Sequence, residues 1–158
     1  MNHFPRPDET NDYLADYVGL LINSLRKLKG ECLTDLSLSL AEQAKQVFEA
    51  PYILLAHNAT NDPVFQYSNK TGLALFEMSW HELTTLHSKY SAEPQNRDQR
   101  ERFLNEVSLK GYVDNYSGVR ISKTGKRFEI KAATVWNIMD ANNIKRGQAA
   151  MFKDYTYL

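Results

Sequence analysis

The pair His57-Asn58 is the first place in the sequence where side chains could bind a small molecule. It follows a short apolar segment that is typical of a buried strand, and it precedes the turn Asp62-Pro63. Imidazole and amide groups both donate and accept hydrogen bonds. We therefore expect this pair either to form a structural hydrogen-bond network or to contact a ligand at the mouth of a cavity.

Two arginines form a second candidate. Arg97 and Arg100 are one turn apart in a segment predicted to be helical, so their side chains lie on one face of that helix. Guanidinium groups placed in this way can bind an anionic ligand through paired hydrogen bonds. The alternative is a structural role for both, in ion pairs with Asp62, Glu77 or Asp114.

Two amides and several aromatic side chains complete the candidate site. Asn137 and Gln148 lie on the last two predicted strands, where their amides could recognise the edge of a planar heterocycle. The alternative is that Asn137 faces solvent at a strand end and Gln148 hydrogen-bonds to backbone. Aromatic residues could line the wall of the site or simply form the core; they are Tyr67, Phe76, Trp80, Phe103 and Trp136.

The sequence holds little that supports catalysis. It has no G-x-S-x-G, phosphate-binding loop, G-x-G-x-x-G or H-E-x-x-H motif, and His81-Glu82 lacks the second histidine of a zinc site. The one plausible acid–base pair is His57 with Asp62. We expect no enzyme activity and no metal site, with a small isomerase-like enzyme as a distant alternative.

Composition excludes several classes of protein. The 158 residues contain 19 basic and 19 acidic side chains, whereas proteins that coat nucleic acids carry a large positive excess. The single cysteine, Cys32, cannot form an internal disulfide. Residues 1–10 lack the apolar stretch of a signal peptide, and no segment approaches the roughly 18 apolar residues of a membrane span. We expect a cytoplasmic protein with no direct nucleic-acid or membrane partner.

A long amphipathic helix is predicted near the N-terminus. Apolar residues recur at steps of three and four from Leu14 to Leu28, and Gly30 follows as a typical C-terminal signal. Thr10 or Asp12 is the expected N-terminal cap. The stripe is too short to predict a coiled coil.

A second helix follows, and the two helices have two possible roles. It begins after Ser39, which forms a capping box with Glu42, and it ends before Pro51. Residues 1–50 carry five basic and eight acidic side chains, net −3, and residues 51–158 carry fourteen and eleven, net +3. We expect the helices either to pack on their own domain or to form a homodimer interface.

The remaining chain alternates between strand and helix patterns. Two strands come first, then short helices and a longer one that starts at Pro94 and ends near Gly111, then three strands joined by polar turns. Such a run of strands favours an antiparallel meander. The predicted strands are 52–56, 64–68, 113–122, 127–138 and 147–153, and the predicted helices are 71–78, one that begins at the capping box Ser79–Glu82, and 94–110.

Several stretches, in this order, resemble the PAS fold and, more narrowly, the MEKHLA family, over about residues 40–153. They are ILLAHNATNDPVFQYSN at 53–69, FEMSW at 76–80, SAEP at 91–94 with Arg97 and Arg100, GYVDNYSGVR at 111–120, and ATVWN at 133–137 with GQAA at 147–150. The resemblance implies an α+β fold in which short helices cover one face of a five-stranded antiparallel sheet and enclose a cavity. Residues 1–38 would be a helical extension and residues 39–158 the PAS-like domain.

The resemblance also implies a function. PAS-like domains sense a ligand, a redox state or light, or they mediate protein contacts. The sequence has no homeodomain or long zipper, so the DNA-binding role of plant MEKHLA proteins does not transfer. We expect a small-molecule sensor that signals through a homodimer or a partner protein, with a ligand-free dimerisation domain as the alternative.

The resemblance narrows the choice of cofactor. A flavin–cysteinyl adduct needs a cysteine on the helix before the central strands, but Cys32 lies outside the PAS-like region. Haem needs an axial histidine, and the helix predicted over 94–110 has none. A non-covalently bound flavin or another small molecule is the remaining possibility for the ligand.

Overall fold

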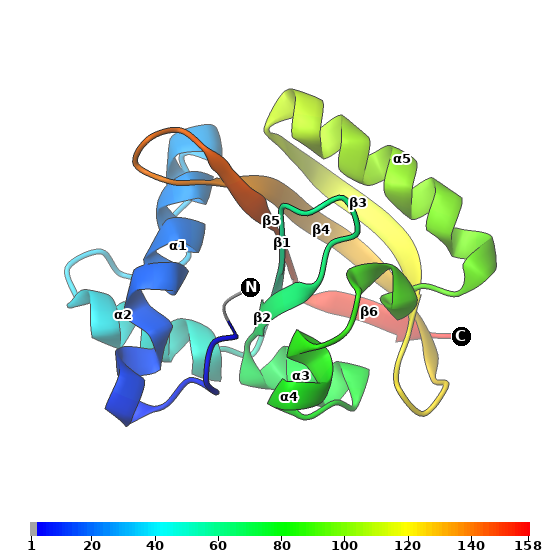
Figure 1. Cartoon of the computed structure of the whole chain (residues 1–158), viewed down its shortest axis with the longest axis horizontal. Helices are drawn as coiled ribbons and strands as arrows, with labels where there is room; N and C mark the ends of the chain where they lie inside the picture. Colours follow the sequence, from blue (N-terminus) through cyan, green and yellow to red (C-terminus); the bar gives the residue numbers. More distant parts are fainter. Residues whose placement is uncertain (1–2) are drawn as a thin grey trace.

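The computed structural model describes residues 3–158, and it contains a single antiparallel sheet with helices on both faces (Figure 1). Its helices are η1 Glu9–Leu14, α1 Ala15–Lys29, α2 Leu40–Glu49, α3 Lys70–Phe76, α4 Trp80–Thr84, η2 Ser88–Ser91 and α5 Pro94–Lys110, where η marks a 3-10 helix. Its strands are β1 Ile53–Asn58, β2 Phe65–Ser68, β3 Tyr112–Ile121, β4 Arg127–Met139, β5 Lys145–Phe152 and β6 Asp154–Tyr157.

The sheet has the order β2-β1-β5-β4-β3, with β6 added beside β4. The five predicted strands are therefore present, and β6 is a sixth that the sequence analysis did not include. Strands β5 and β6 both pair with β4, one after the other along its length. Strand β5 pairs with Thr134–Met139, and β6 pairs with Phe128–Lys131. The bend at Lys153 between the two strands lies opposite Ala132, whose φ of 50° marks an irregularity in β4.

Most helix ends follow their sequence signals. The capping boxes at Ser39 and Ser79 are both formed, Pro94 opens α5, and Gly30 ends α1 with a left-handed φ of 79°. The predicted N-terminal cap was wrong. The side chain of Asp8 caps the 3-10 helix η1 instead, because it accepts a hydrogen bond from the Thr10 backbone N–H at 2.8 Å.

The apolar stripe of α1 is buried against the sheet of its own chain. Trp136 of β4 donates its indole N–H to the Leu21 carbonyl at 3.1 Å, and Ser24 accepts a hydrogen bond from the Met139 backbone N–H at 2.8 Å. The buried members of the stripe are Tyr17, Val18, Leu21, Ile22 and Leu25. Of the two roles expected for this helix, the structure shows packing on its own domain. The stripe is therefore buried and cannot form an interface with a second copy of the chain.

Asn69 joins α3 to the first strand and to α2. Its side chain accepts hydrogen bonds from the backbone N–H groups of Leu54 and Gly72, both at 3.1 Å. It donates to the carbonyls of Val47 and Tyr52 at 3.1 and 2.8 Å. The side chain is fully buried, so water cannot satisfy these backbone groups if the asparagine is removed.

The face of the sheet opposite α1 is covered by α5 (Figure 1). The cavity lies on this face, between the sheet and the helix. Successive residues of β4 point to opposite faces, so Trp136 contacts α1 while Asn137 contacts α5. Across residues 3–158, every helix is too short or too polar to cross a lipid bilayer. Within the same residues, no group of three or more His, Cys, Asp or Glu side chains is placed to hold a metal ion.

Candidate functional site

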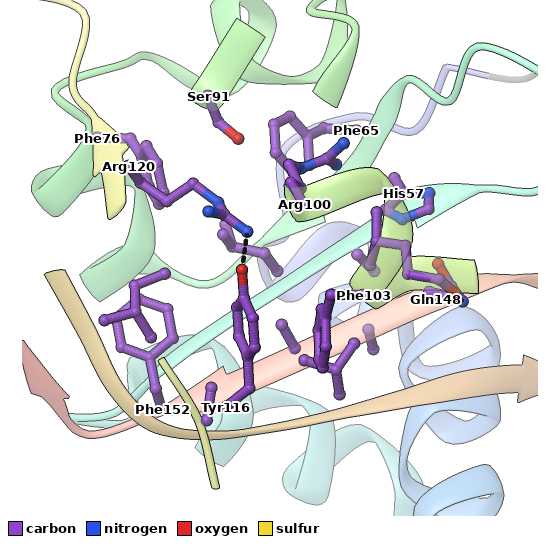
Figure 2. A pocket seen from close by; sticks show the side chains of 18 residues that line it. His57, Phe65, Phe76, Ser91, Arg100, Phe103, Tyr116, Arg120, Gln148 and Phe152 are labelled. Carbon is purple, nitrogen blue, oxygen red and sulfur yellow. Dashed lines mark hydrogen bonds between the residues drawn. The ribbon is translucent and has the colours of Figure 1, made fainter. Parts of the chain in front are cut away.

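A small cavity lies between the sheet and α5. Its volume is about 60 Å3, and its walls come from β1, β3, β4 and β5, from α5, and from single residues of β2, α3 and η2 (Figure 2). Most of the lining is apolar, but four positions carry polar or charged groups that face or border it. These are His57, Arg100, Arg120 and Gln148, joined by the hydroxyls of Ser91 and Tyr116.

Two arginines line this cavity without a carboxylate partner. Arg100, on α5, is 8% exposed and donates one hydrogen bond, to Ser88 Oγ at 2.8 Å. Arg120, on β3, is 7% exposed and donates to the Val119 carbonyl at 2.9 Å and to the Tyr116 hydroxyl at 3.1 Å. No ion pair to either guanidinium exists within residues 3–158.

The two positive charges destabilise each other. Burial and, to a smaller extent, the nearby charge of Arg120 together lower the pKa of Arg100 to about 10. A guanidinium keeps its proton at neutral pH even so. The folded domain therefore holds two like charges beside one cavity, an arrangement that an anion would relieve.

Stacked rings form the wall next to Arg120. The ring centroids of Phe103 and Tyr116 are 3.6 Å apart and their planes are 12° from parallel. The Tyr116 hydroxyl accepts the hydrogen bond from Arg120 (Figure 2). It donates one to Gln99 Oε1 at 3.1 Å. Both rings are thus fixed in place, one on α5 and one on β3.

His57 lies where the cavity meets an outer cleft. The cleft has a volume of about 800 Å3 and shares His57, Arg100, Leu104 and Gln148 with the cavity. The Nδ1 atom of His57 donates to the Asn58 carbonyl at 2.9 Å, which leaves Nε2 as an unprotonated acceptor.

The Nε2 atom of His57 is buried and has no hydrogen-bond partner within the described residues. Burial lowers the pKa of His57 to about 4, and the charges of Arg100 and Lys145 act in the same direction. The Gln148 amide raises this pKa slightly, although it makes no hydrogen bond of good geometry with Nε2. His57 is therefore a neutral hydrogen-bond acceptor at physiological pH.

Asn58 and Arg97 line the outer cleft but are held by the protein itself. The Asn58 side-chain oxygen accepts hydrogen bonds from the Thr60 hydroxyl at 2.8 Å and from the Val64 backbone N–H at 3.0 Å. Arg97 Nε donates to the Ala92 carbonyl at 3.0 Å, and its guanidinium lies 5.0 Å from the centre of the Tyr90 ring. Of the two predicted arginines, Arg100 alone reaches the cavity.

The carboxylates proposed as partners for these arginines are engaged elsewhere. Asp62 pairs with Lys89 and His87, Glu77 with Lys126, and Asp114 with Lys29. The predicted ion pairs are therefore wrong. Asp62 also forms no hydrogen bond or ion pair with His57 within residues 3–158, so the two do not make an acid–base dyad.

A comparison with family models matches the MEKHLA domain over residues 15–157. This chain belongs to the MEKHLA domain family. The match begins at Ala15 and so includes α1, which agrees with the packing of that helix on β4. A comparison with curated protein sequences finds no match.

Solved structures of PAS and Light-Oxygen-Voltage domains share the fold of this MEKHLA domain. A PAS domain from Colwellia psychrerythraea has a TM-score of 0.60 at 15% identity, covering 75% of this chain and 96% of that one. An RNA-binding Light-Oxygen-Voltage receptor has a TM-score of 0.63 at 10% identity, covering 75% of this chain and 34% of that one. A Light-Oxygen-Voltage domain studied with a flavin analogue has a TM-score of 0.58 at 12% identity, covering 74% and 84%.

The residues of the MEKHLA cavity do not fit a flavin. Its volume of about 60 Å3 is far below the roughly 300–1,000 Å3 of pockets that enclose ligands of drug size. Its lining includes no cysteine, and Cys32 is exposed in the loop between α1 and α2.

The two amides proposed to recognise a heterocycle bind α5 instead. Asn137 donates to the Ser108 carbonyl at 3.2 Å and accepts from Gln148 Nε2 at 3.2 Å. Gln148 also reaches the Leu104 carbonyl at 3.1 Å. The backbone bond predicted for Gln148 is present, whereas Asn137 is buried rather than facing solvent. Together the amides hold the helix against β4 and β5.

The predicted aromatic wall is divided between the two faces of the sheet. Phe76 and Phe103 line the cavity. Tyr67, Trp80 and Trp136 lie outside it, in the core shared with the N-terminal segment. Trp80 donates its indole N–H to the Phe4 carbonyl at 2.8 Å, and its ring meets Tyr67 edge-on at 5.8 Å.

Sequence reasoning missed Arg120, Tyr116 and Ser91. A signal for the first two existed, because Tyr116, Gly118 and Arg120 alternate along β3 and therefore share one face. An arginine on the same face of a strand as a buried tyrosine is unusual, and it therefore indicates a candidate binding site. Ser91 lies in a short 3-10 helix and carried no such signal.

Proposed function

We propose that this MEKHLA domain is a sensory or regulatory module that binds a small molecule in the cavity between the sheet and α5. One observation carries the proposal: Arg100 and Arg120 are buried, line this cavity and form no ion pair with a carboxylate of the described residues. Unpaired buried charges cost folding free energy. Such a cost is typical of sites that a ligand completes.

The position of the arginines suggests how binding leads to a signal. Arg100 belongs to α5 and Arg120 to β3, so a molecule that contacts both links the helix to the edge of the sheet. Only a ligand with different affinities for two arrangements of α5 changes their populations. We propose that α5 passes this change to a partner protein or a second copy in the cytoplasm.

A ligand-free interaction domain is the second candidate, because the cavity is small and most of its lining is apolar. In that case the domain would act through its outer surfaces alone. A homodimer would then use faces other than the buried stripe of α1.

Native mass spectrometry of the freshly purified full chain separates the two candidates. The sensor proposal expects a population heavier than the calculated mass, whose excess disappears on denaturation. Screening of small molecules by thermal shift should then find compounds that raise Tm in a saturable way. A native mass equal to that of the bare chain, together with no stabilising compound, would leave only the interaction domain.

A further inference from the structure

We infer that the molecule held in this cavity is a short monocarboxylate, with its carboxylate between Arg100 and Arg120 and its alkyl end toward the apolar wall. The inference rests on the proposed function and adds the chemical class of the ligand. It follows from charge, hydrogen bonding, wall chemistry and size, each taken from the described residues.

The charge of the site requires an anion. Each guanidinium has five N–H donors, and of these ten the protein uses one on Arg100 and two on Arg120. Both residues are more than nine-tenths buried and have no ion pair within residues 3–158. A carboxylate that accepts from both guanidiniums supplies one negative charge, shared by the pair, and hydrogen-bond acceptors for both.

The other walls favour a ligand with one anionic group. The Ser91 hydroxyl donates to the Ser88 carbonyl at 2.7 Å, and the Tyr116 hydroxyl donates to Gln99. Neither is free to donate to further oxygens of a phosphate or a second carboxylate. The rest of the cavity is apolar, including Phe76, Phe103 and Phe152.

The volume limits the length of the ligand. The cavity volume of about 60 Å3 exceeds the roughly 10–15 Å3 that one water needs and lies far below the roughly 300–1,000 Å3 of pockets for drug-sized ligands, so it favours a ligand of a few non-hydrogen atoms. Acetate and propionate have this size.

The outer cleft offers a route of entry for an anion. It shares Arg100, His57 and Gln148 with the cavity. Its lining carries four basic side chains and two carboxylates, so its formal charge is +2. The basic residues are Lys89, Arg97, Arg100 and Lys145, and the carboxylates are Asp62 and Glu101. Such a field concentrates small anions at the mouth.

Titration calorimetry on the full chain tests the inference, with sodium acetate and propionate against their neutral amides at constant ionic strength. We expect saturable binding of the acids and none of the amides, which have the same shape without the charge. Arg100→Met and Arg120→Met should each weaken binding roughly 10- to 100-fold, as expected for the loss of hydrogen bonds to a charged group. Arg102→Met is the matched control, because Arg102 is exposed on the same helix.

The location is tested by NMR with methyl-labelled acetate, which should show contacts to the rings of Phe103 and Tyr116. Equal binding of acids and amides, equal binding of phosphate, or equal weakening by Arg102→Met would overturn the inference. If native mass spectrometry finds a retained neutral molecule while acids do not bind, the sensor function stands and the carboxylate assignment fails. If nothing binds, both fail.

Discussion

Mild acid should destabilise this domain mainly through one residue, His57. The folded chain holds His57 neutral, with its pKa lowered to about 4 by burial and by the charges of Arg100 and Lys145, whereas the unfolded chain has the ordinary value of 6.5. Between these values the unfolded state binds one more proton than the folded state, so the free energy of unfolding falls as the pH falls. The stabilising effect is complete above about pH 6.5 and is lost toward pH 4.

The size of this effect follows from the two pKa values. The loss approaches about 3 kcal/mol near pH 4, because each pKa unit corresponds to about 1.4 kcal/mol. At about pH 5 the same linkage gives about 2 kcal/mol, or roughly 4–8 °C in Tm for a chain of this length.

Urea denaturation at about pH 7.5 and pH 5 measures this difference for wild type, His57→Gln and His81→Gln. We expect His57→Gln to lose most of the decrease in stability between the two pH values, whatever its stability at pH 7.5. His81 is exposed and serves as the control that keeps the decrease. An equal decrease in wild type and His57→Gln would refute the assignment to His57.

Three further predictions concern stability. Asn69→Ala removes partners from four buried backbone groups and should cost about 3 kcal/mol or more in urea denaturation, against little for exposed Asn105→Ala. Gly147→Ala should prevent stable folding as judged by circular dichroism, because φ is 150° and the new Cβ would lie 1.9 Å from the His57 carbonyl oxygen; a folded variant would contradict this. Arg100→Met should stabilise the ligand-free domain by about 1–2 kcal/mol, because it removes a charge destabilised by about 3 kcal/mol and also loses the bond to Ser88; a less stable variant would contradict the unpaired charge.

The order and ends of most elements could be predicted because their signals are local. Capping boxes, Pro94 at the start of α5 and Gly30 at the end of α1 act within one helical turn. The cap at Asp8 could not be predicted in this way, because η1 contains non-helical residues that break the periodic pattern before α1.

The face of the sheet that each side chain occupies was harder to predict. In β4, Ile130 and then Ala133 and Val135 line the cavity, so the alternation shifts by one residue at Ala132. A bulge of this kind places Trp136 and Asn137 on faces that a simple count along the strand cannot assign. Of the residues proposed from the sequence for a ligand site, Arg100, His57 and Gln148 line the cavity, whereas Arg120, which also lines it, was not among them.

The contact between α1 and β4 also determines when the chain can complete its fold. Leu21 and Trp136 are 115 residues apart, as are Ser24 and Met139. At a synthesis rate of about 5–20 residues per second, the first helix leaves the ribosome on the order of ten seconds before its partner strand exists. During that interval α1 can pack only against nearby segments such as α2, because its partner on the sheet is absent. The native contacts between α1 and β4 can therefore form only after nearly the whole domain has been synthesised.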